Sequence, residues 1–136
     1  MHISHSCRGL YLQLRRIGEI RPYLSMDSTK KLAVAFILSH LDYCNAMLAG
    51  FPDEKIAKLQ RIQNSAAQLV LRKSNRDSAT ALLRTLHWLH VNARIKYKVA
   101  TICHQCIHND EVLSYLTELI TQYVPKDPYA PSTNLN

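Results

Sequence analysis

Glycine is scarce in this sequence: there are only 3 among 136 residues, and Gly9, Gly18 and Gly50 stand apart from one another. Tight β-turns and phosphate-binding loops both depend on glycine. The scarcity therefore disfavours an all-β fold and excludes a glycine-rich nucleotide loop. The 10 acidic residues are scattered, and no two aspartates are adjacent. Because two-metal phosphoryl transfer needs converging carboxylates, we expect neither an active centre nor a cofactor.

Long apolar runs are absent as well. No stretch reaches the roughly 18 apolar residues of a membrane span, and arginines interrupt the N-terminal region where a secretory signal would be apolar. We therefore expect an intracellular protein, nuclear or cytoplasmic, with no membrane contact. Its four cysteines, Cys7, Cys44, Cys103 and Cys106, should then be reduced thiols.

What the chain does contain is apolar residues at helical spacing. Successive segments with this pattern predict an all-α fold, a compact bundle of about five to seven helices. Pro125, Pro128 and Pro131 predict an extended or disordered C-terminal tail. The expected organisation is a helical domain over residues 1–123 and a tail over residues 124–136.

The clearest single helix is predicted from Pro52 to Lys73. Proline followed by Asp53 and Glu54 suits a helix start. One arc of this helix should be buried, and it carries Ile56, Leu59, Ile62, Ala66, Ala67, Leu69 and Val70. The opposite arc should be solvent-exposed and positively charged, and it carries Lys58, Arg61, Ser65 and Arg72.

The N-terminal helix has a heptad-like apolar stripe, formed by Ile3, Cys7, Leu10, Leu14 and Ile17. It should end at the Arg21–Pro22 step, because the residue before proline leaves the helical region. Because the stripe begins almost at Met1, we expect no preceding structure within this chain for the helix to pack on, and the stripe is a candidate surface for homo-oligomer formation.

Further helices are predicted along the chain. One starts near Ser25 or Asp27 and is expected in the core, with apolar residues Leu32, Val34, Ala35, Phe36, Leu38 and Leu41. A short helix over Leu82, Leu83 and Leu86 should follow a polar loop at 74–77. A connector at 87–90 should then contribute Trp88 to the core. Two more helices are expected at 91–108 and 111–123, the first burying Val91, Ile95, Val99, Ile102 and Cys106.

Charge is the main functional signal. The net charge is +7, divided between +10 in residues 1–98 and −3 in residues 99–136. A basic body favours polyanionic partners. The candidate nucleic-acid-binding residues are Arg15, Arg16, Arg21, Lys58, Arg61, Arg72, Lys73 and Arg76. The alternative for the same residues is an ordinary solvated face.

A weaker pattern is His87-x2-His90-x12-Cys103-x2-Cys106. These two pairs could supply the four ligands of a tetrahedral zinc site. The competing interpretation is a small buried Cys106 and histidines in a turn. We favour no metal, and keep zinc as the alternative.

Six short strings stand in one order along the chain: Leu14–Arg15–Arg16–Ile17, Ile20–Arg21–Pro22–Tyr23–Leu24, Leu41–Asp42–Tyr43–Cys44–Asn45, Leu59–Gln60–Arg61–Ile62–Gln63–Asn64 with Ala66–Ala67, Leu86–His87–Trp88–Leu89 and Ala93–Arg94–Ile95. Together they resemble the region after the palm in reverse transcriptases of non-LTR (LINE-type, jockey-like) retrotransposons. The resemblance runs from about Cys7 to Tyr123. In that family the segment corresponds to the thumb and the helical part that follows it.

The resemblance implies a piece of an RNA-directed DNA polymerase that holds RNA or an RNA/DNA template-primer and leaves catalysis to the palm. The palm with its paired aspartates is absent, His90 stands where the family usually has proline, and the Cys103–Cys106 run is outside its pattern. We therefore expect a non-catalytic fragment. The alternatives are a helical protein-interaction or self-association module, and a relic reading frame without selected function.

Overall fold

The computed structural model describes residues 3–44 and 48–108, and these residues are helical throughout apart from short turns and loops, with no strand among them. The helices are α1 (Ile3–Ile20), α2 (Met26–Ala33), α3 (Ser39–Cys44), α4 (Asp53–Leu71), α5 (Ala79–Leu86) and α6 (Val91–His108). A 3₁₀ turn, η1 (Arg21–Tyr23), follows α1. A π-helical segment, η2 (Val34–Leu38), joins α2 and α3 into one continuous rod. The predicted all-α bundle is confirmed.

Local sequence signals set most helix ends. α1 stops before the Arg21–Pro22 step, as predicted. The Ser25 side chain caps α2 by accepting a hydrogen bond from the Ser28 N–H at 3.1 Å. Gly50 adopts a left-handed φ of 89° in the turn before α4, a conformation that glycine tolerates without strain. The tail, the helix predicted at 111–123 and the boundary at 123/124 lie outside the described residues.

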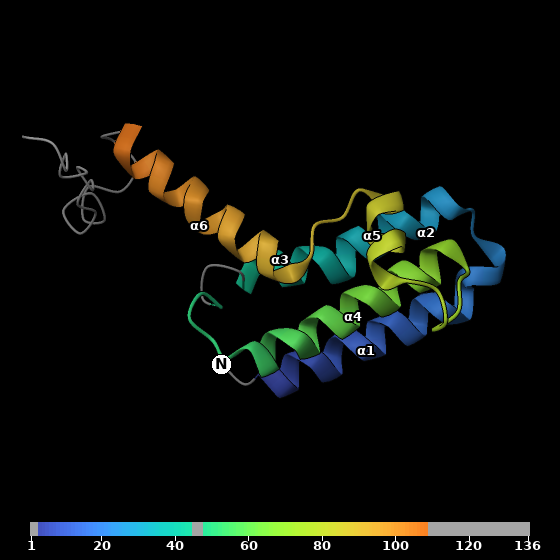
Figure 1. Ribbon diagram of the computed structural model, residues 1–136. Coiled ribbons are helices and arrows are strands. Elements are labelled where there is room, and N and C mark those ends of the chain that lie inside the picture. The colour runs from blue at the N-terminus through green and yellow to red at the C-terminus, as the bar shows by residue number, and fades with distance from the viewer. Residues whose placement is uncertain (1–2, 45–47, 109–136) are drawn as a thin grey trace, which may run out of the picture. The chain divides into compact units, whose positions relative to one another are not determined.

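The chain divides into two units after residue 100, and the described residues up to residue 100 form the first. In the first unit, α1 and α4 lie side by side (Figure 1). The two helices run parallel. At their starts, the charge of Lys58 on α4 acts on Cys7 of α1. At their ends, Arg21, which directly follows α1, donates hydrogen bonds to the last turn of α4. Between them lies a core of fully buried aliphatic side chains, to which α2, η2 and α5 also contribute.

The buried stripe predicted for α1 is confirmed where its side chains are described: Cys7, Leu10, Leu14 and Ile17 are buried. They are buried within this chain, in the core shared with α4. The expectation that this stripe serves an oligomer therefore has to be corrected, because its apolar area is already covered.

The α2–η2–α3 rod is less central than predicted. Ala33, Ile37 and Leu41, which follow one another at intervals of four, are buried. Val34, Ala35 and Phe36 lie on the other arc and are exposed, so their predicted place in the core is wrong. Val99 on α6 was likewise expected on a buried stripe with Val91 and Ile95, but it is exposed at the rim of an open groove.

Candidate nucleic-acid interface

Two rows of side chains flank the outer seam between α1 and α4. On α1, Arg8, Tyr11, Arg15 and Gly18 follow one another at intervals of three and four, and so form one stripe. On α4, the stripe is Lys58, Arg61, Ser65 and Leu69, and Arg72 follows as the residue that ends the helix. The two stripes border each other, because a Cβ on Gly18 would lie 3.8 Å from Leu69 Cδ1.

α1 and α4 are also close to each other near their N-terminal ends. Burial raises the pKa of the Cys7 thiol, and the positive charge of Lys58 opposes that rise. Lys58 is therefore electrostatically close to Cys7, while its side chain is exposed. The helical rise from Lys58 to Leu71, the last residue of α4, is about 20 Å. That length corresponds to roughly six phosphates of one duplex strand.

Most of the predicted basic residues are exposed on this unit: Arg15, Arg16, Lys58, Arg61, Arg72, Lys73 and Arg76. Arg15 has an ion pair with Glu19 at 3.6 Å, and both side chains are largely exposed, so solvent screens the pair. Within the described residues, Lys58, Arg61, Lys73 and Arg76 form no ion pair. We call the set Arg8, Arg15, Lys58, Arg61 and Arg72 the seam cations.

Arg21 is a correction to the predicted set, because only 8% of it is exposed. Its guanidinium donates to the carbonyl oxygens of Leu69 at 3.0 Å, Val70 at 2.8 Å and Leu24 at 2.8 Å. The first two belong to the last turn of α4, whose carbonyls have no partner within the helix. Arg21 thus caps α4 and does not face solvent as a phosphate ligand.

Arg72, Lys73 and Arg76 extend the positive row past the end of α4. Arg72 closes the helix in a left-handed conformation, with φ 52°, and its guanidinium donates to the Arg21 carbonyl at 3.3 Å. The loop behind it is held by Asp77, whose Oδ2 accepts from the Ser74 N–H at 2.9 Å. This contact fixes the backbone beside Arg76 while leaving the arginine side chain exposed.

Arg8 was missing from the predicted set. Its position opposite the apolar stripe of α1 was visible in the sequence, but the sequence could not show that α4 brings a second basic row beside it. The spacing of seven between Arg8 and Arg15, repeated by Lys58, Ser65 and Arg72, is the signal that could have identified the pair of rows.

The zinc alternative finds no support in the described residues, where no group of three or more His, Cys, Asp or Glu side chains is placed to hold a metal ion. His87 ends α5 in a left-handed conformation, with φ 58°. Cys106 is buried and Cys103 partly so. Trp88 is buried in the core, as predicted.

The strings that carry the retrotransposon resemblance contact one another in this unit. Gln63 donates to the Leu89 carbonyl at 2.8 Å, and Gln60 Oε1 accepts from the Val91 N–H at the start of α6, also at 2.8 Å. Asp42 and Arg94 form a bidentate ion pair. These polar residues therefore hold the elements of this unit together.

No protein-family model, curated protein or solved structure matches this chain. Within the described ranges 3–44 and 48–108, no helix has the length and apolar character needed to cross a membrane.

Proposed function

We propose that this chain is a non-catalytic, nucleic-acid-binding fragment of a non-LTR retrotransposon reverse transcriptase, corresponding to its thumb and the helical part that follows. In this proposal the chain binds the sugar-phosphate backbone of RNA or of an RNA/DNA template-primer. The observation that carries the proposal is the pair of basic stripes at the α1–α4 seam, whose cations are exposed while the residues beneath them form the core.

Physical chemistry favours backbone contacts over base reading at this seam. Arginine and lysine neutralise phosphates and release condensed counterions, a contribution that does not depend on sequence. Lys58 and Arg61 on the seam, and Lys73 and Arg76 just past its end, have no ion pair within the described residues. A duplex laid along the seam would meet them without breaking an existing contact.

The test is a titration of the full chain with a fluorescently labelled 20-base-pair RNA/DNA hybrid, read by anisotropy between 50 and 200 mM salt. We expect the logarithm of the binding constant to fall linearly with the logarithm of salt concentration. The double variant Lys58→Gln/Arg61→Gln should bind more weakly. Its slope should be smaller by about two, because two phosphate contacts are lost.

The matched control is Arg84→Gln/Lys96→Gln, which removes the same charge from exposed positions on α5 and α6. It should leave the slope within about half a unit of the wild-type value. Binding that is absent, or that both double variants weaken equally, would contradict the proposal. Nucleotide incorporation by the purified chain would contradict its non-catalytic part.

A further inference from the structure

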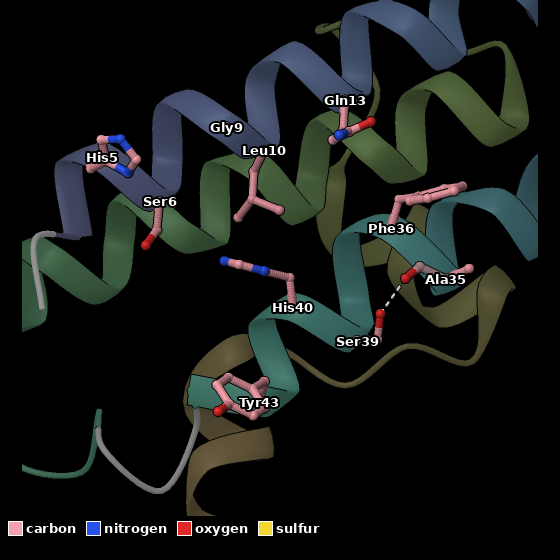
Figure 2. A pocket seen from close by; sticks show the side chains of 10 residues that line it. All are labelled: His5, Ser6, Gly9, Leu10, Gln13, Ala35, Phe36, Ser39, His40 and Tyr43. Carbon is pink, nitrogen blue, oxygen red and sulfur yellow. Dashed lines mark hydrogen bonds between the residues drawn. The ribbon is translucent and has the colours of Figure 1, made fainter.

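An open groove lies on the other flank of α1 from the seam, between α1 and the η2–α3 part of the rod (Figure 2). Its volume is about 550 Å³. One wall comes from α1, with His5, Ser6, Gly9, Leu10 and Gln13; the other comes from η2 and α3, with Ala35, Phe36, Ser39, His40 and Tyr43.

The η2–α3 wall is a row of rings. Phe36, His40 and Tyr43 are separated by four and three residues, so they follow one another along one face over roughly 10 Å. Phe36 is 51% exposed and Tyr43 84% exposed. Aromatic rings that stay this exposed in a folded unit do not gain the free energy of apolar burial. Adjacent exposed aromatic side chains are typical of binding surfaces.

The α1 wall is recessed and polar. Gly9 carries no side chain, and a Cβ placed there would meet nothing within 4 Å. Gln13, Ser6 and His5 line the groove around it. Their amide, hydroxyl and imidazole groups can both donate and accept hydrogen bonds. The rings on one wall could stack on the face of a nucleobase. The donors and acceptors on the other wall could form hydrogen bonds with its edge.

The π-helical segment lies in this wall. η2 spans Val34–Leu38, and its geometry leaves both Ala35 and Phe36 lining the groove while Ile37 and Leu38 are buried. Ser39 Oγ donates to the Ala35 carbonyl, a contact drawn in Figure 2. Single π-helical turns occur often at functional sites, and this one faces the groove.

A cation is also near. Arg16 follows Gly9 by seven residues, two turns further along the same face of α1, and it is exposed. Surfaces that bind single-stranded nucleic acid combine stacking rings with cations that follow the backbone. Phe36, His40 and Tyr43 supply the rings here, and Arg16 supplies the charge.

We propose that this groove binds unpaired bases of single-stranded nucleic acid, which stack on Phe36, His40 and Tyr43 while Gln13 and Ser6 contact their edges. The proposal rests on the proposed function, and it adds a single-strand site on the opposite flank of α1 from the seam cations. Stacking tolerates any base, because every base has a π-face. The site therefore selects unpaired strands over duplex, without reading sequence.

The experiment compares a labelled 12-nucleotide oligo-dT with a 20-base-pair RNA/DNA hybrid, by anisotropy, on the full chain. Phe36→Ala and Tyr43→Ala should each weaken oligo-dT binding about tenfold, and should change duplex binding less than twofold. Tyr43→Phe keeps the ring and should bind oligo-dT like the wild type. An abasic 12-mer should bind more weakly than oligo-dT and be insensitive to Tyr43→Ala.

Tyr23→Ala is the matched control, since Tyr23 is 88% exposed and lies outside the groove. It should leave oligo-dT binding unchanged. Circular dichroism should show the same melting temperature for all variants, because each altered ring is exposed. Equal oligo-dT affinity for Tyr43→Ala, Phe36→Ala and Tyr23→Ala would overturn the groove proposal.

The two proposals fail in distinguishable ways. Normal salt-dependent duplex binding, with no effect of the ring variants on oligo-dT, refutes the groove and leaves the seam intact. Oligo-dT binding that depends on the rings, without any duplex binding, supports the groove and refutes the duplex grip. Absence of binding to either probe refutes both.

Discussion

The carboxylate of Asp42 on α3 accepts two hydrogen bonds from the guanidinium of Arg94 on α6, at 2.8 and 2.5 Å, across 52 positions of sequence. The pair joins the rod to the start of α6, within the unit formed by residues 1–100. Arg94 is more sheltered than Asp42, with 18% and 47% of the side chains exposed. Bidentate geometry and partial shelter make this pair stronger than an ordinary surface ion pair.

A double-mutant cycle of Asp42→Ala and Arg94→Ala should therefore give a coupling free energy of about 1 kcal/mol in urea unfolding. The comparison is the exposed Asp27–Lys31 pair, one turn apart on α2. Its coupling should be clearly smaller, because solvent screens an exposed pair within one helix. Equal coupling in the two cycles would mean that the Asp42–Arg94 pair contributes no more than a solvated contact.

Arg21 should be important for stability. Replacing it by leucine leaves carbonyl oxygens of α4 without their donor, and we expect a loss of about 3 kcal/mol in the free energy of unfolding. Arg21→Lys keeps the charge but not the planar fork, so it should recover only part of that loss. Arg16→Leu serves as the control, because Arg16 is exposed, and should change stability by less than about 0.5 kcal/mol. If Arg21→Leu behaved like Arg16→Leu, the cap would have no energetic role.

Gln63 is fully buried in the middle of α4, and its amide also accepts from Gln60 at 3.0 Å. Gln63→Met keeps the length of the side chain but removes the donor to the Leu89 carbonyl and the acceptor for the Gln60 amide. The expected cost is about 2 kcal/mol in thermal or urea unfolding. Gln68→Met, on the same helix and only partly buried, should cost less than about 0.5 kcal/mol. A smaller loss for Gln63 than for Gln68 would contradict the assigned hydrogen bond.

The helices and their ends were predictable from the sequence, because they depend on neighbours along the chain. The Arg21–Pro22 step ends α1, Ser25 caps α2, and the glycine and proline at 50 and 52 separate α3 from α4. The buried arc of α4 was predictable for the same reason, since apolar spacing alone specifies which side of a helix faces the core. The tertiary structure confirmed Leu59, Ile62, Ala66, Ala67 and Val70 as buried.

Only the tertiary structure could distinguish a basic residue that caps a helix from one that faces solvent. Arg21 and Arg16 look alike in the sequence, but Arg21 meets the carbonyls that end α4, whereas Arg16 faces solvent. Likewise, nothing local places Lys58 near Cys7, or Phe36 and Gly9 in one groove. Helical periodicity fixes the direction of each side chain about its own axis. Which helix lies in that direction depends on packing between segments that are distant in sequence.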